Sequence, residues 1–245
     1  MLAVTPPPHV VRRIGRALLE YRAVATALGL VALPRRPRQI ARYIDTHERR
    51  YLRLGAGRQT DSGWLSVDLI PLSFRVVYMD ATKPFPLPPG SFDAVHCEHV
   101  IEHIPYEGAM TMLAECHRIL RPGGLLRIAT PNLALVARLI TSGSSDPDLR
   151  EYVEWSNRGY GTAAEQRDPA NPAFAANRLV RNWGHTFIYD EATLRTALRD
   201  AGFHDIVTVE PRTSSHPELH GIDRHHEEIG TTANDLETLL LEATA

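Results

Sequence analysis

The stretch Tyr51-Leu-Arg-Leu-Gly55-Ala-Gly57-Arg-Gln-Thr-Asp-Ser-Gly-Trp64-Leu-Ser-Val-Asp68 decides the fold. A short run that favours a β-strand ends at the two glycines, and a second such run ends at Asp68. Glycines after a parallel strand let the backbone turn tightly and let a ligand approach without a Cβ in the way. An acid at the tip of the next strand is placed to accept hydrogen bonds from ribose hydroxyls. The stretch predicts strand, glycine turn and strand, and the turn is either a nucleoside-binding turn or an ordinary one.

Further strand-like and helix-like runs follow this stretch. Strands are expected at 76–79, which ends on Asp80-Ala81, at 91–97, and at 125–129 after the turn Arg121-Pro-Gly-Gly124. Helices are expected from Glu98 to Ile104 and from Met110 to Leu120, where apolar residues recur at roughly helical spacing. Strands that alternate with helices predict an α/β fold with a parallel sheet.

Taken together, these ordered motifs resemble those of class I S-adenosylmethionine-dependent methyltransferases. The resemblance covers residues 51–132, resumes at 185–210, and rests on Leu-Gly-Ala-Gly57, Asp68, Asp80-Ala81, Ser-Phe-Asp93, Glu102-His103 and Leu-Arg-Pro-Gly-Gly124. It implies a Rossmann-like α/β fold with a mostly parallel seven-stranded sheet and helices on both faces. It also implies that residues 1–50 form an N-terminal helical lid and that residues 51–245 form the methyltransferase domain.

The resemblance also implies the cofactor site. The expected S-adenosylmethionine contacts are Gly55, Ala56, Gly57, Asp68, Leu69, Asp80, Ala81 and Cys97. Asp80 would accept the adenine amino group, and the backbone of Cys97 would meet the methionine part of the cofactor. Only ten residues separate Gly57 from Asp68. A crossover helix needs a dozen residues or more, so this spacing argues against a nicotinamide dehydrogenase.

Composition limits the remaining classes. The chain has 245 residues, 43% hydrophobic and 23% charged residues, and a formal net charge of −2, so nucleic acid and membranes are not expected partners. Cys97 and Cys116 do not make a disulfide framework, which favours a cytoplasmic location. The apolar run 23–33 is too short to span a bilayer.

The flanking segments are less regular. Helices are expected at 9–33 and 39–50, and the arginines around 35–50 either bind an acidic substrate or form a solvated helix face, which is the favoured interpretation. An inserted loop at 141–184, with a helix at 149–157, carries aromatic residues that either bind substrate or only anchor the loop. A helix from Glu191 to Ala201 and a strand at 203–209 follow. A terminal helix is expected at 231–245.

The block His99-Val-Ile-Glu102-His103 is the candidate for chemistry. On a helix, these three side chains would share one face, and imidazole with carboxylate makes a divalent-metal site plausible. The block resembles the Glu-x-x-Glu-His motif of small-RNA 2′-O-methyltransferases, which implies His185 as a fourth ligand. The predicted catalytic and metal-binding residues are therefore His99, Glu102, His103 and His185, with Mg²⁺ or Mn²⁺ as the metal. The alternative interpretation of Glu102-His103 is structural, at the start of a helix.

The expected activity is O-methylation of a sugar or oligosaccharide hydroxyl, because a metal-bound hydroxyl is a better nucleophile. The chain resembles methyltransferases of bacterial polysaccharide biosynthesis, so a carbohydrate or other polyol is the expected partner. The alternative is a metal-independent N- or O-methyltransferase of a peptide or small natural product, with His99 or His103 as general base. A nucleic-acid 2′-O-methyltransferase and a non-catalytic cofactor-binding module are the other classes considered.

Overall fold

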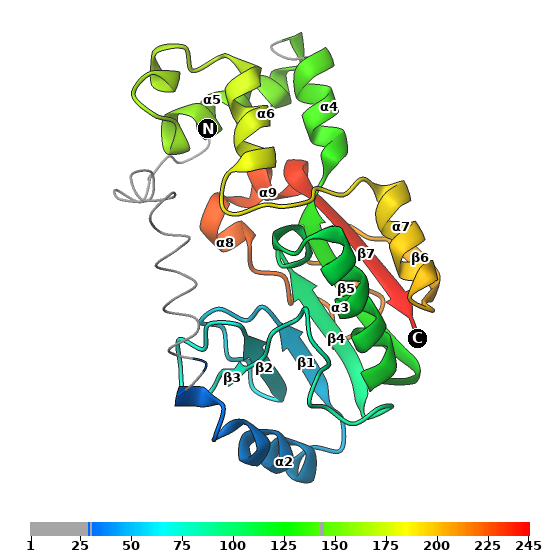
Figure 1. The fold of residues 1–245 in the computed structure, drawn as a ribbon. Helices are drawn as coiled ribbons and strands as arrows, with labels where there is room; N and C mark the ends of the chain where they lie inside the picture. The colour runs from blue at the N-terminus through cyan, green and yellow to red at the C-terminus, as the bar shows by residue number, and fades with distance from the viewer. Residues whose placement is uncertain (1–28, 30, 143–144) are drawn as a thin grey trace.

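A seven-stranded sheet in the order β3-β2-β1-β4-β5-β7-β6 forms the centre of the protein. The computed structural model describes residue 29, residues 31–142 and residues 145–245. β7 runs antiparallel to β5 and β6, and the other neighbouring strands are parallel (Figure 1). The strands are β1 Tyr51–Leu54, β2 Trp64–Asp68, β3 Val77–Tyr78, β4 Phe92–Glu98, β5 Leu120–Pro131, β6 His204–Thr208 and β7 Thr238–Thr244. The predicted Rossmann-like α/β fold with a mostly parallel sheet is confirmed.

Helices cover one face of this sheet and lie at both of its ends. They are α2 Arg36–Thr46, α3 Tyr106–Ile119, α4 Leu133–Thr141, α5 Pro147–Tyr160, α6 Pro172–Arg181, α7 Glu191–Asp200, α8 His226–Ile229 and α9 Thr231–Glu237. Asp190 caps the start of α7, because its carboxylate accepts a hydrogen bond from the Thr193 backbone N–H. None of the described helices has the length and apolarity needed to cross a membrane.

The face of the sheet that packs on α3 and α7 is apolar. Leu52, Val95, Leu126 and Ala243 stand in register across β1, β4, β5 and β7 and belong to the main core. Strands buried on both faces normally read as continuous apolar runs. In this sheet only the face toward α3 and α7 is apolar.

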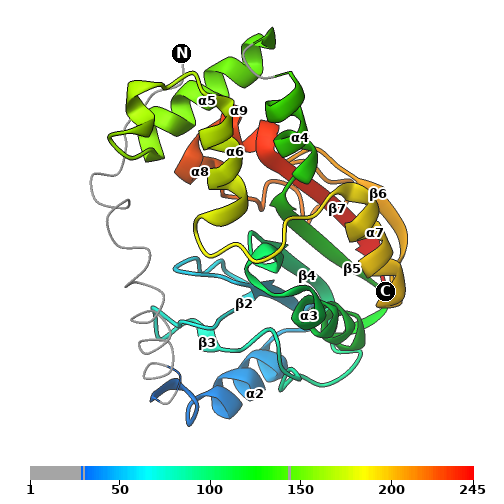
Figure 2. The same cartoon turned by 45° about the horizontal axis from the view of Figure 1, so that its top comes forward.

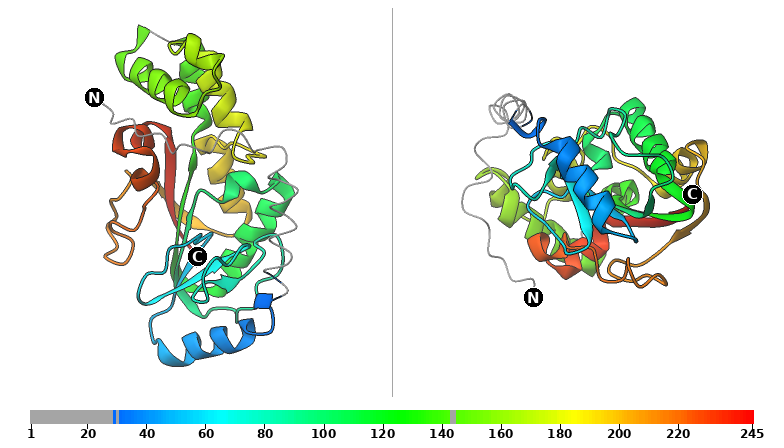
Figure 3. Two further views of the ribbon diagram at one scale, coloured as in Figure 1. Left: turned by 90° about the vertical axis from the view of Figure 1, so that its left-hand side faces the viewer. Right: turned by 90° about the horizontal axis from the view of Figure 1, so that it is seen from below.

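The opposite face carries a row of buried polar side chains at one register. Arg53 of β1 pairs with His96 of β4, His96 with Arg127 of β5, and Arg127 with Glu242 of β7, and each is at most 3% exposed. No helix follows β1, because residues 55–63 reach β2 directly. The segment 210–225 covers this face instead, on the side of the sheet opposite α3 (Figure 3).

The helix α2 lies at the amino ends of the strands. The hydroxyl of Tyr43 donates to the carbonyl oxygen of Gly63 at 2.8 Å and accepts from the N–H of Tyr51, the first residue of β1. Burial of this hydroxyl raises the pKa of Tyr43 to about 12. The glycine turn lies at the other end of β1, so α2 does not cover it. Most of the predicted helix at 9–33, and with it the rest of the predicted lid, lies outside the described residues.

Two segments differ from the sequence predictions. The expected terminal helix at 231–245 is wrong, because α9 ends at Glu237 and β7 begins at Thr238, paired with both β5 and β6. The inserted segment 141–184, which was expected to be largely irregular, contains α5 and α6. These helices pack with α4 in a second apolar core at the end of the sheet away from α2 (Figure 2).

Candidate functional site

The turn after β1 requires glycine. Gly55 and Gly57 have φ angles of +71° and +55°, in the left-handed region that side chains disfavour. A Cβ on Gly55 would lie 2.0 Å from Cγ2 of Val100, so a larger residue cannot fit without displacing that side chain. The turn therefore brings bare backbone to the carboxyl end of the sheet, where α/β folds bind their ligands.

The acid at the tip of β2 holds this turn. The Asp68 carboxylate accepts the N–H of Gly57 at 2.8 Å through Oδ2 and the N–H of Ile70 at 2.7 Å through Oδ1. Burial raises the pKa of Asp68, and these two hydrogen bonds oppose that rise. Asp80 likewise uses Oδ1 to accept from the N–H and hydroxyl of Thr82. Both acids occupy the predicted strand ends, and their contact with a cofactor stays a prediction.

A cavity of about 650 Å³ begins at the glycine turn and reaches the helices α5 and α6. This volume is in the range of small-molecule sites. Gly55, Ala56 and Gly57 line one part of the cavity, and His103, Trp183 and His185 line another. The remaining predicted cofactor contacts do not line the cavity formed by the described residues: Asp68, Leu69, Asp80, Ala81 and Cys97. Cys97 is fully buried, and burial raises the pKa of its thiol well above the usual value.

Three of the four predicted metal ligands come together. One ligand atom each from Glu102, His103 and His185 lies within 4.8 Å of the others. His185 Nδ1 bonds the carbonyl oxygen of Leu179 at 2.6 Å, which fixes its tautomer and leaves Nε2 for a ligand. The Thr130 hydroxyl donates to Glu102 Oε2 at 3.0 Å. Hydrogen bonds of this kind, to the far side of a ligand residue, orient the ligands in metal sites. Two imidazoles with one carboxylate suit Mn²⁺ better than Mg²⁺.

The surroundings of Glu102 and His185 favour the protonation states that can bind a cation. Burial alone would raise the pKa of Glu102, but the hydrogen bond from His99 and the charges of His99 and His103 lower it to about 2. Burial lowers the pKa of His185. A carboxylate and a neutral imidazole are the forms that bind a cation.

The predicted helix across residues 98–104 is wrong, and this changes the role of His99. Only Ile101–His103 is helical, as one turn of 3₁₀-helix, and His99 has a φ of 51°. His99 Nδ1 bonds Glu102 Oε1 at 3.0 Å, so His99 lies beside the carboxylate and outside the group of three. Its Nε2 is buried and forms no hydrogen bond with any described residue. In this arrangement His99 positions Glu102.

His225 and Glu237 are site residues that were not predicted. The ring of His225 lies 3.8 Å from that of His99, centroid to centroid, and its Nε2 is 3.6 Å from Glu237 Oε1. Glu237 Oε2 accepts the hydroxyl of Tyr152 at 2.7 Å. All four side chains line the cavity. His225 belongs to the histidine-rich segment that could not be placed from sequence, and no local pattern indicates its contact with His99.

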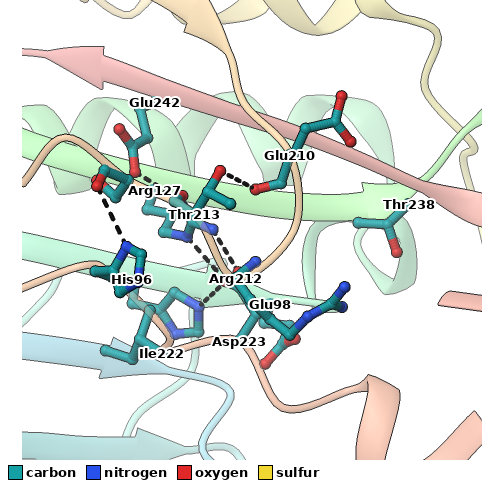
Figure 4. Close-up of polar contacts among 12 residues, drawn as sticks. His96, Glu98, Arg127, Glu210, Arg212, Thr213, Ile222, Asp223, Thr238 and Glu242 are labelled. Carbon is teal, nitrogen blue, oxygen red and sulfur yellow. Dashed lines mark hydrogen bonds and ion pairs between the residues drawn. The ribbon is translucent and has the colours of Figure 1, made fainter. Parts of the chain in front are cut away.

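A buried ionic cluster holds His225 in place (Figure 4). The Asp223 carboxylate accepts from Arg127 Nε at 2.9 Å, from His96 Nε2 at 3.1 Å and from the Arg212 N–H at 2.7 Å. Two residues further on, the N–H of His225 donates to Glu98 Oε1 at 2.9 Å, at the end of β4. The covering segment 210–225 is thus fixed to the sheet immediately before it enters the cavity.

Comparison with known proteins adds the family of the central segment. Residues 54–128 match the family model described as a methyltransferase domain. This segment is similar to a methyltransferase domain. It contains the glycine turn, both strand-end acids and the block 98–103, so the resemblance found in the sequence is confirmed for this part of the chain.

Individual relatives are more distant. The chain is 37% identical over 59 residues to methyltransferase str3 of Strobilurus tenacellus, and the match spans about a fifth (21%) of that protein's length. A methyltransferase from Archaeoglobus fulgidus that depends on S-adenosylmethionine is 19% identical, covers 88% of this chain and 93% of its own, and has a TM-score of 0.46. A phosphoethanolamine N-methyltransferase of Haemonchus contortus is 16% identical, covers 84% of this chain and 51% of its own, and has a TM-score of 0.41.

Proposed function

We propose that this protein is an S-adenosylmethionine-dependent O-methyltransferase that acts on a hydroxyl of a sugar or oligosaccharide, with a divalent cation at Glu102, His103 and His185. One observation carries the proposal: the group of three potential ligands shares a cavity with the glycine turn of a methyltransferase domain. A cytoplasmic location, and independence from nucleic acid and membranes, belong to the same proposal.

Different residues of this cavity can bind the cofactor, bind the cation and accept the proton. The glycine turn would hold the methionine part of the cofactor, which supplies the methyl group on its sulfonium when bound. A divalent cation bound by Glu102, His103 and His185 would lower the pKa of a coordinated hydroxyl and fix its direction. Glu102 is kept ionised and in place by His99 and Thr130. His225 lines the same cavity outside this group of three, and its imidazole can take up the hydroxyl proton.

The helices α5 and α6 enclose the acceptor side of the cavity. Tyr152, Trp155 and Tyr160 of α5 and Leu179 of α6 line it, so water has limited access to the reacting atoms. Methyl transfer is a displacement in which holding the two reactants in line supplies much of the rate. A preformed cavity with aromatic walls fits this requirement.

The second candidate is a metal-independent N- or O-methyltransferase of a peptide or small molecule. The contact of His225 with Glu237 favours it, because a carboxylate that orients an imidazole makes a general base without a metal.

One experiment separates the two candidates. The protein is stripped with EDTA and given methyl-labelled S-adenosylmethionine together with sugars, oligosaccharides, peptides or small amines, with and without added Mn²⁺ or Mg²⁺. Label in a sugar that disappears with EDTA and returns with Mn²⁺ is the expected result. Label in a peptide or amine at full rate in EDTA selects the second candidate. Tight cofactor binding without label in any sugar contradicts the proposal.

A further inference from the structure

The turn that leads into His185 contains Trp183, a residue type that the backbone geometry of this turn disfavours. The His185 N–H bonds the carbonyl oxygen of Asn182 at 3.1 Å, and the two central residues, Trp183 and Gly184, have φ angles of 58° and 86°. Two positive φ angles are the mark of a type I′ turn, in which asparagine, aspartate or glycine is preferred at both central positions. A bulky residue such as Trp183 is an outlier in this conformation.

Burial does not explain Trp183 either. Its side chain is 40% exposed, so it gains little from the apolar core. Its ring lies 5.8 Å from the ring of Tyr160, nearly at a right angle, and 5.8 Å from the ring of His185. Tyr160 thus packs against Trp183, and both residues line the cavity. Strained residues that neither the local turn nor the core requires are found mainly at functional sites.

The position of the indole relative to the ligand group indicates what it binds. The ring of His185 lies next to both Trp183 and His103, with centroid distances of 5.8 Å and 5.0 Å. A flat acceptor that lies on the indole therefore has its edge beside the imidazoles. Pyranose rings have a face of C–H groups and an edge of hydroxyls, which matches an aromatic surface next to a cation site.

We propose that Trp183 is the stacking surface for the acceptor ring and determines specificity for pyranosides. The C–H face of the sugar lies on the indole, and two neighbouring hydroxyls of its edge lie toward His103 and His185. The inference rests on the proposed function and names the residue that selects the substrate.

The turn geometry makes this role testable. Trp183→Asn places a residue that the turn favours, so the variant should melt at the wild-type temperature or above it. Its KM for methyl mannoside, methyl glucoside and methyl galactoside should rise by about tenfold or more, the size of effect that loss of one aromatic stack produces. Cofactor affinity should not change, and Trp183→Phe should retain most of the binding.

Phe74→Asn is the matched control, since Phe74 is 82% exposed and does not line the cavity. It should leave every kinetic constant unchanged. Wild-type KM values in Trp183→Asn would overturn the inference while leaving the proposed function intact. A lower melting temperature together with weaker cofactor binding would show that Trp183 is a structural anchor, which also overturns it. If the wild-type protein binds cofactor but methylates none of the three pyranosides, both the proposed function and the inference are rejected.

Discussion

Asp223 accepts hydrogen bonds from Nε and Nη2 of Arg127, and both residues are almost fully buried. Burial would raise the pKa of Asp223, but its bonds to Arg127 and His96 lower it below the usual 3.8. A carboxylate with a lowered folded-state pKa stabilises the fold above its unfolded pKa, and loses that contribution as pH falls through the folded value. The pair connects β5 to the segment that carries His225.

Asp223→Asn should therefore destabilise the protein near neutral pH. Removing one partner of a buried ion pair costs about 3–5 kcal/mol, and urea unfolding at pH 7 should show a loss of this size. The difference from wild type should narrow only below about pH 4, where Asp223 of the unfolded wild-type chain begins to take up a proton while the folded carboxylate stays ionised. Asp235→Asn is the control, because its pair with Arg212 is exposed and should contribute less than about 1 kcal/mol. Equal losses in the two variants would show that the buried pair has no special role.

Gly55→Ala should weaken cofactor binding by more than backbone strain alone would cause. The new methyl group would meet Val100 Cγ2 at 2.0 Å, so either Val100 or the turn at Gly55, which lines the cavity, would have to shift. Gly63→Ala provides the comparison, since Gly63 also has a positive φ, of 82°, but has open space around it. Both variants should lose about 1–2 kcal/mol of stability from the left-handed conformation. Only Gly55→Ala should also lose affinity for S-adenosylhomocysteine in calorimetry, and similar affinities in the two proteins would contradict this prediction.

Asp68→Ala should weaken S-adenosylmethionine binding by about 1.5–3 kcal/mol, because the N–H groups of Gly57 and Ile70 lose a charged acceptor and the turn is released. Asp80→Ala should have a smaller effect, since its carboxylate oxygen Oδ1 holds only the neighbouring Thr82. Calorimetric titration of both variants measures the difference. Unchanged affinity in Asp68→Ala would remove this residue from the cofactor site.

His185→Ala and Glu102→Gln should each weaken Mn²⁺ binding by at least about tenfold, measured by calorimetry without any acceptor. His185→Ala removes a ligand atom, and Glu102→Gln keeps the shape of the side chain but removes its charge. His220→Ala is a suitable control, because His220 is exposed, does not line the cavity, and its ring contacts the Ser214 carbonyl oxygen. Mn²⁺ affinity that stays the same in both site variants, or that falls equally in the control, would reject the metal site.

The first half of the site is predictable because its signals are local. Gly55, Gly57 and Asp68 lie within one strand-turn-strand unit, and each conformation follows from a residue type with few alternatives. His185 is also recoverable, because its surroundings resemble a known downstream motif. The convergence of Glu102, His103 and His185 is correct, although the helical spacing used to infer it is not.

The rest depends on contacts between distant segments. Residues 238–244 contain leucine, glutamate and alanine, which favour a helix, but pairing with β5 and β6 outweighs that preference. The segment that carries His225 into the cavity is held by the hydrogen bond between Asp223 and Arg127, which lies 96 residues earlier in the sequence. No pattern of neighbouring residues carries that information.

The position of β7 also determines when the protein can finish folding. β7 comes after the six other described strands in the sequence, yet it lies between β5 and β6 in the sheet. While it is missing, Leu126 and Ile128 of β5 have no partner on that side, and β6 lacks the one described strand with which it pairs. A nascent chain that stops before Thr238 therefore exposes an apolar strand edge, which favours pairing with other chains. We expect fragments that end at residue 237 to aggregate during synthesis, whereas the chain through residue 245 closes its own sheet.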